Sequence, residues 1–96
     1  MPEHEEPVKI AVTNQINGRE NNDVHINDDW TMEKVREKAY DATKDKPRPT
    51  DRFTCTDPNK DITGALLSET YEKFTLNGGF CPHEKHFYIR GPTGGA

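Results

Sequence analysis

The chain has 96 residues, of which 30% are hydrophobic and 31% are charged, and its formal net charge is -4. This length allows one small domain with a compact core. The acidic balance argues against nucleic acid as the main partner, because phosphate binding needs a basic face. No apolar run is long enough to span a bilayer, and the acidic start "MPEHEEP" lacks a signal-peptide pattern. We therefore expect a soluble cytoplasmic monomer with no membrane or nucleic-acid partner.

The first part of the domain reads as a β-hairpin. Apolar side chains alternate with others from Val8 to Thr13, which indicates a half-buried strand. The dipeptide NG follows, and it is typical of a tight hairpin turn. A second alternating run becomes clear at Val24 and Ile26. The residues near the turn are polar, so we expect the hairpin to fray there.

The pattern then changes to a helical period. Apolar side chains recur at spacings of three and four, which predicts one helix from about Thr31 to Lys44. Aspartates precede this stretch and favour a helix start, whereas Pro47 and Pro49 forbid continuation beyond it. The apolar stripe of this helix consists of Met32, Val35, Ala39 and Ala42.

The second half of the chain contains shorter elements. The stretch DRFTC predicts a short strand with Phe53 and Cys55 on one face, and Ile62 with the following "ALL" predicts another short strand or an apolar connection. SETYEKF indicates one turn of helix, and KHFYIR is the last strand, with Tyr88 and Arg90 facing outward. The inward residues expected to cover the helix stripe are Ile10, Val12, Ile26, Phe53, Phe87 and Ile89.

This order of elements predicts an α+β fold. A helix between two pairs of strands must cover one face of a single sheet. The last strand follows a crossover, so it can pair parallel to the first strand in the middle of the sheet. We therefore expect a β-grasp, a mixed sheet of four or five strands packed on one α-helix, over residues 8–90. A disordered acidic tail precedes it at residues 1–7, and a flexible tail follows at residues 91–96.

The two cysteines, Cys55 and Cys81, are too few for a disulfide framework. We expect Cys55 to be a small core residue and Cys81 to lie in a polar loop, with no disulfide between them. The stretch CPHEKH contains a cysteine and two histidines, but its spacing fits no standard zinc pattern. The sequence therefore predicts no metal site and no cofactor.

Several motifs, taken in order, resemble those of the ubiquitin-like protein modifiers. WTMEKVREKAYDATKDKPRPTDRF resembles the helix and following loop of ubiquitin, and KHFYIRGPTGG resembles its last strand and diglycine tail. The layout is even more similar to that of small bacterial modifiers, with "INGR", "RPTDRF", "ALL", "GGF" and "GPTGGA" in that order. The resemblance covers roughly residues 8–96 and implies a ubiquitin-like β-grasp.

The resemblance also implies a function. Such a modifier is not an enzyme but the substrate of an activating enzyme, a conjugating enzyme and a zinc peptidase of the JAB type. Its terminal carboxylate is adenylated, passed to a cysteine as a thioester and transferred to target proteins. Gly94 and Gly95 allow the backbone to pass through a narrow channel. Ala96 has to be removed first, because the reactive carboxylate belongs to Gly95.

The resemblance also suggests which surface residues partner proteins would recognise. Ubiquitin has an apolar binding patch, whereas the outward positions here are Thr54 on the third strand and Tyr88 on the last. Recognition by ubiquitin receptors is therefore not expected. Tyr88 with Ile16 is a candidate for a replacement surface, and Tyr88 could equally be an ordinary exposed cross-strand aromatic. The residues that the resemblance assigns to recognition by partner enzymes are Arg90, Gly91, Pro92 and Tyr88.

Two other functions stay open on the sequence. A sulfur carrier also has a β-grasp that ends in diglycine and is adenylated, but it forms a thiocarboxylate and usually ends at the glycine pair. A domain that only binds partners without being conjugated is the second alternative, because a fold by itself does not settle a function.

Overall fold

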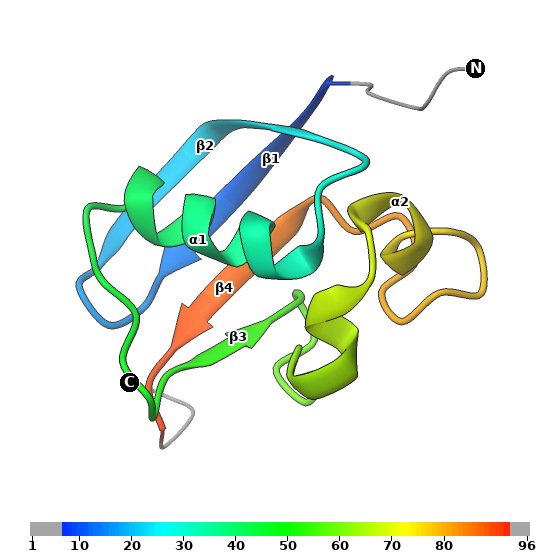
Figure 1. Cartoon of the computed structure of the whole chain (residues 1–96). Coiled ribbons are helices and arrows are strands. Elements are labelled where there is room, and N and C mark those ends of the chain that lie inside the picture. Colours follow the sequence, from blue (N-terminus) through cyan, green and yellow to red (C-terminus); the bar gives the residue numbers. More distant parts are fainter. Residues whose placement is uncertain (1–6, 93–96) are drawn as a thin grey trace.

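The computed structural model describes residues 7–92, which form a single four-stranded sheet covered by helices (Figure 1). The strands are β1 (Pro7–Asn14), β2 (Arg19–Asn27), β3 (Arg52–Thr54) and β4 (His86–Arg90). The helices are α1 (Met32–Ala42), the short 3-10 helix η1 (Gly64–Ser68) and α2 (Tyr71–Phe74).

The sheet is mixed, with the strand order β2-β1-β4-β3. β1 pairs antiparallel with β2 and parallel with β4, so that Ala11 lies opposite His86 and Asn14 opposite Ile89. β3 pairs antiparallel with β4 at the other edge. The predicted α+β class, with the last strand parallel to the first inside the sheet, is therefore confirmed. Of the two sequence alternatives for Leu66 and Leu67, the apolar connection is the correct one, since both lie in η1.

Helix α1 lies close to its predicted place. Thr31 is the N-cap, and its Oγ1 accepts a hydrogen bond from the Lys34 backbone N–H at 3.3 Å. The helix ends two residues before the predicted Lys44, because Thr43 is the C-cap and Lys44 adopts a left-handed conformation with φ 56°. A left-handed residue after the last turn is a common way for a helix to end.

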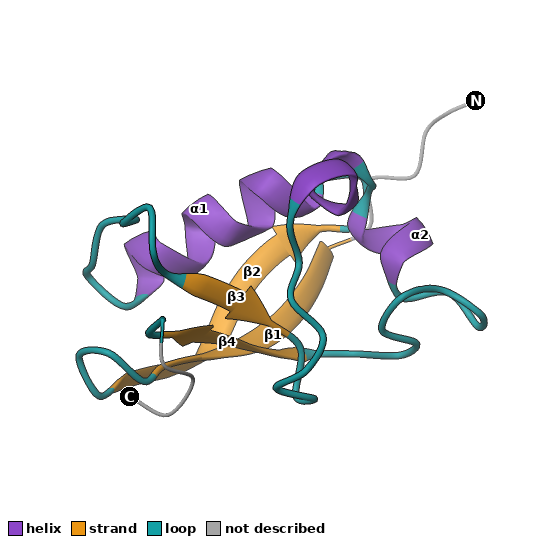
Figure 2. Ribbon diagram, turned by 90° about the horizontal axis from the view of Figure 1, so that it is seen from below, coloured by secondary structure: helices purple, strands orange, loops and turns teal. Residues whose placement is uncertain are grey.

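The core lies between α1 and the sheet, and Figure 2 shows α1 across one face of the sheet and α2 beside its end. Every side chain predicted to cover the helix stripe is buried. On α1 itself, Ala42 is only partly buried, whereas Tyr40, which the period did not include, is 3% exposed. The buried hydrophobic residues are Ile10, Val12, Val24, Ile26, Met32, Val35, Ala39, Tyr40, Phe53, Cys55, Ile62, Tyr71, Phe74, Cys81, Phe87 and Ile89.

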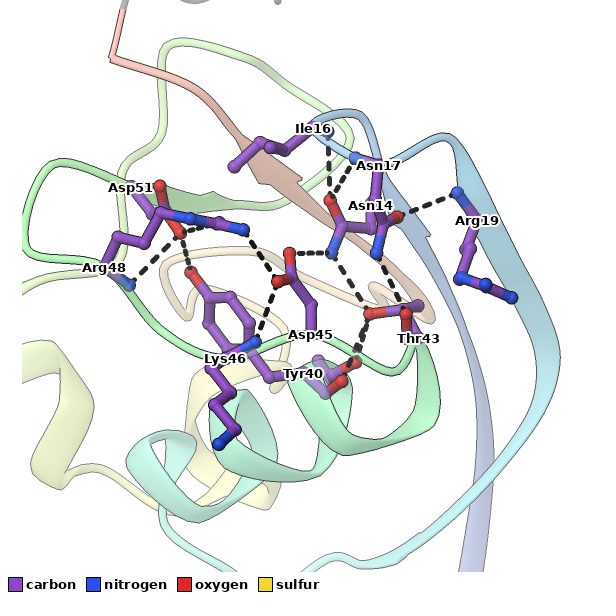
Figure 3. A network of polar contacts seen from close by, with 11 residues as sticks. Asn14, Ile16, Asn17, Arg19, Tyr40, Thr43, Asp45, Lys46, Arg48 and Asp51 are labelled. Atoms are coloured by element: carbon purple, nitrogen blue, oxygen red, sulfur yellow. Dashed lines mark hydrogen bonds and ion pairs between the residues drawn. The ribbon is translucent and has the colours of Figure 1, made fainter.

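The hairpin turn, near which the sequence predicts fraying, is held by the buried polar side chain of Asn14. The amide of Asn14 donates to Thr43 Oγ1 at 3.2 Å and to Asp45 Oδ2 at 3.0 Å (Figure 3). Its carbonyl oxygen accepts from the backbone N–H groups of Ile16 and Asn17. The turn is thereby tied to the end of α1, and β2 begins at Arg19 directly after it.

The same polar network continues into the loop after α1. Arg48 forms ion pairs with Asp45 at 2.7 Å and with Asp51 at 3.0 Å, and the Tyr40 hydroxyl donates to Asp51 at 2.8 Å (Figure 3). Burial of the Asp45 carboxylate acts to raise its pKa, but hydrogen bonds from Asn14, Lys46 and Arg48 outweigh it and lower the pKa below its ordinary value. The network thus links the hairpin, α1 and the approach to β3.

Candidate functional site

The predicted conjugation residues Gly94, Gly95 and Ala96 lie outside the described residues. The structure does describe the root of this tail, where the chain leaves the sheet. β4 ends at Arg90, after which Gly91 is buried and Pro92 is exposed. The candidate site is therefore built from the end of β4 and the side chains that surround it.

The sequence predicts an outward Arg90 that partner enzymes recognise, but the structure shows this residue buried. Arg90 is only 7% exposed. Its Nε donates to Thr54 Oγ1 at 2.7 Å and its Nη1 to Gln15 Oε1 at 3.0 Å, while Nη2 lies 3.5 Å from the Thr56 carbonyl oxygen. Thr54, also expected at an outward position, is fully buried by the same contact. The guanidinium thus joins β4 to β3 and to the residue after β1.

Tyr88 lies in the middle of a stack on β4. Its ring is parallel to the His86 ring, with 4.5 Å between centroids, and the Arg90 guanidinium lies 4.5 Å from its centroid on a cation–π contact. His86 Nε2 is 2.8 Å from Thr13 Oγ1 on β1. Tyr88 is therefore half-buried by its own neighbours, and Ile16 in the hairpin turn is 37% exposed. The suggested Tyr88 and Ile16 surface remains a prediction.

The two cysteines form a disulfide, so the prediction that they stay unpaired is wrong. Cys55 and Cys81 are bonded across a sequence separation of 26 residues, and both are buried. The sequence interpretation placed Cys81 in a polar loop. In the structure this loop folds back on α2, where the Cys81 N–H donates to the Phe74 carbonyl at 3.1 Å and Phe80 packs on Phe74. This contact carries Cys81 into the core beside the end of β3.

The disulfide also bears on metal binding. Cys81 is bonded in the disulfide and offers no thiolate to a metal ion, so the stretch CPHEKH lacks what would be its strongest metal ligand. Within residues 7–92, no group of three or more histidine, cysteine, aspartate or glutamate side chains is placed to hold a metal ion.

Like the disulfide, the Glu84 side chain connects the segment after β3 to a distant part of the chain, and the sequence did not predict this connection. Its Oε2 accepts from the Thr56 hydroxyl at 2.8 Å and from the His86 backbone N–H at 3.2 Å, and its Oε1 lies 3.4 Å from the Thr56 backbone nitrogen. Glu84 therefore connects the residue after Cys55 to the start of β4. Together with the disulfide, it holds the segment 54–56 that contacts Arg90.

An open hollow of about 490 Å³ lies at the opposite end of the sheet from the tail root. Its lining includes Val8 near the start of β1 and Lys85 just before β4, and these two strands run parallel. Tyr71 lines it too and donates its hydroxyl to the Glu84 carbonyl at 2.6 Å. Burial first, and then the charge of Glu84, raises the pKa of Tyr71 to about 12. The hollow takes no part in the geometry of the tail.

Comparison with known proteins adds no family. No protein-family model matches the chain, and no curated protein or solved structure is significantly similar to it. Its function has to be argued from its own residues.

Proposed function

We propose that this chain is a ubiquitin-like protein modifier with a β-grasp fold. The observation that carries the proposal is the position of β4. It is the last described strand, it lies parallel to β1 inside the sheet, and it ends at Arg90 directly before the sequence GPTGG. A central strand is held on both sides, so it provides a rigid base from which a slim tail can enter a partner enzyme.

The reaction takes place on the modifier rather than by it. A JAB-type zinc peptidase hydrolyses the Gly95–Ala96 peptide bond and frees the Gly95 carboxylate. An activating enzyme joins that carboxylate to AMP from ATP with release of pyrophosphate. A cysteine thiolate then displaces AMP to give a thioester, and a conjugating enzyme passes the acyl group to a target protein. Glycine suits these steps because it has no side chain to obstruct a narrow channel.

The cytoplasm is part of this proposal, because adenylation needs ATP. Within the described residues, no helix is both long enough and apolar enough to cross a membrane. The buried Cys55–Cys81 disulfide is of a kind found more often in oxidising compartments. Alkylation of thiols in protein taken rapidly from the native host therefore tests the compartment separately from the chemistry.

Mass spectrometry of the protein recovered from its native host tests the function. We expect molecules that end at Gly95, and target peptides that carry a fragment ending in Gly94-Gly95 after digestion. The variant Gly95→Val should be neither processed nor conjugated, whereas Thr93→Ser is a matched control that keeps the tail slim. If all recovered protein retains Ala96 and no adduct through Gly95 is trapped, the modifier proposal fails.

The sulfur-carrier alternative gives a different mass. A thiocarboxylate on Gly95 replaces one oxygen by sulfur and reacts with alkylating agents, whereas a thioester or isopeptide adduct does not. Intact-mass analysis before and after alkylation therefore separates the carrier from the modifier in the same sample.

A further inference from the structure

We infer that Arg90 is a buried clamp that fixes the root of the tail, so that the segment able to enter a partner begins at Pro92, directly after the buried Gly91. This inference deepens the proposed function, and its functional part rests on that function. The clamp itself is a property of residues that the structure describes.

The contacts of the guanidinium carry the inference. Each of its three nitrogens faces a separate oxygen, on Thr54, Gln15 and the Thr56 backbone. The three partners belong to β3, the residue after β1 and the residue after Cys55, so a single side chain ties β4 to two neighbouring segments. A planar guanidinium can reach three such oxygens at once, whereas a lysine ammonium lacks this fork geometry.

The clamp is supported from behind. Cys55 lies between Thr54 and Thr56 and is bonded to Cys81, and Glu84 accepts hydrogen bonds from Thr56. On its remaining side the guanidinium lies against the Tyr88 ring. A partner enzyme that reads the charge of Arg90 would first have to break these contacts and leave buried oxygens without donors, which is costly.

The clamp defines what a partner meets. Beyond Arg90 the sequence to Gly95 is GPTGG, which has no charged side chain. Five residues reach at most about 18 Å when fully extended. We therefore expect the activating enzyme and the peptidase to accept this tail in a narrow uncharged channel, and to leave Arg90 in place.

Limited trypsin digestion of the native, oxidised full chain tests the clamp directly. Trypsin cuts after both arginine and lysine, so Arg90→Lys keeps a cleavable bond while it loses the fork. Initial rates of release of residues 91–96 are followed by intact mass. We expect wild-type protein to be cut after residue 90 at least tenfold more slowly than Arg90→Lys. Thr54→Val, which removes one oxygen without changing the arginine, should be cut at an intermediate rate.

Arg52→Lys is the matched control. Arg52 lies opposite Arg90 in the sheet and makes a similar fork, to Asp61 at 2.7 Å and 3.0 Å and to the Pro58 carbonyl at 2.6 Å. Its side-chain hydrogen bonds run to Asp61 and Pro58 and not to the tail, so Arg52→Lys should keep the wild-type rate after residue 90. Melting temperatures measured alongside distinguish local opening from unfolding. Equal cleavage rates in wild type and in a folded Arg90→Lys protein would overturn the clamp. So would an Arg52→Lys protein that is cut after residue 90 as fast as Arg90→Lys.

A kinetic measurement tests the functional part. With the peptidase activity of a native-host extract, release of Ala96 is followed as a function of modifier concentration. A loosened tail root should raise KM several-fold in Arg90→Lys and leave kcat unchanged, because the scissile bond itself is intact. An unchanged KM would show that the clamp does not present the tail. If no variant is processed after Gly95, the proposed function fails, while the trypsin result still decides the clamp.

Discussion

Two regions of this small domain are stabilised in different ways. In residues 7–45, the hairpin and α1 bury side chains at regular intervals and share the polar network around Asn14. In residues 56–85, the crossover contains two short helices, and η1 has no buried residue. The crossover places fewer side chains in the core, namely Ile62, Tyr71, Phe74 and Cys81. It is further held by single links, namely the disulfide, the Tyr71 hydroxyl on the Glu84 carbonyl, and Lys60 Nζ on the Phe80 carbonyl at 2.8 Å. Stabilising contacts are therefore more widely distributed in the first region and concentrated at fewer residues in the second.

The largest effect is expected where the two regions meet. Phe87 is fully buried, and its ring stacks on Phe53 at 5.6 Å and meets the Tyr71 ring edge at 6.1 Å. Phe87→Ala should lower the free energy of unfolding by about 3–5 kcal/mol, because it leaves a cavity that the sheet and α1 cannot fill. Urea denaturation gives this value. Phe87→Leu keeps the site apolar and should lose clearly less, and an equal loss in both variants would contradict the cavity explanation.

Removal of the disulfide should separate the two regions. The double variant Cys55→Ser with Cys81→Ser should lose about 3–4 kcal/mol, the amount expected for closing a loop of 26 residues in the unfolded chain. Hydrogen exchange should rise in residues 56–85 before it rises in α1. Wild-type protein treated with a reductant is the control and should behave in the same way. Uniform acceleration across the whole chain would show that the crossover is not a separate unit.

Asn14→Ala should weaken the other region. It removes four hydrogen bonds around the hairpin turn and leaves buried donors and acceptors unpaired, so a loss of about 1–3 kcal/mol is expected. Exchange should accelerate in residues 15–18 and leave the crossover unchanged. Asn22→Ala on the exposed part of β2 is the matched control and should lose little. A similar loss in both variants would refute the importance of the network.

The smallest effect at neutral pH is expected for Tyr71→Phe, which removes one hydrogen bond worth about 1 kcal/mol. The effect should depend on pH. The pKa of Tyr71 is raised to about 12 in the folded protein, so its contribution is complete below the ordinary value near 10 and is lost as pH rises toward 12. Free energies of unfolding measured between neutral pH and pH ~12 should fall more steeply for wild type than for the variant. Parallel curves would contradict this assignment.

The sequence predicted the region with regular periods. Alternation from Val8 and the three-and-four spacing from Met32 determine which faces are apolar, and one apolar helix face needs one sheet face to cover it. The parallel position of β4 followed from the crossover that precedes it. These inferences depend on local patterns, so they do not require knowledge of which distant side chains meet.

The features that the sequence did not predict depend on contacts between side chains far apart along the chain. The burial of Arg90 was not predicted, because nothing local shows that Gln15 and Thr54 supply oxygens to it. Tyr40 lies off the apolar stripe, yet it is buried in the core with its hydroxyl bonded to Asp51. Cys81 follows a loop whose return onto α2 has no periodic signal. The even number of cysteines was the one available hint of a disulfide.

The parallel pairing of β1 and β4 has a consequence for synthesis of the chain. Ala11 pairs with His86, which is 86 − 11 = 75 residues further along, so the middle of the sheet is made last. Pairings of such large separation are slow to form, since loop closure precedes any gain from the contacts. On the ribosome, β1 and the inner face of α1 have to wait for β4 before the core closes. A chain cut short before residue 90 cannot complete its sheet, so folding itself acts as a check that the tail root has been made.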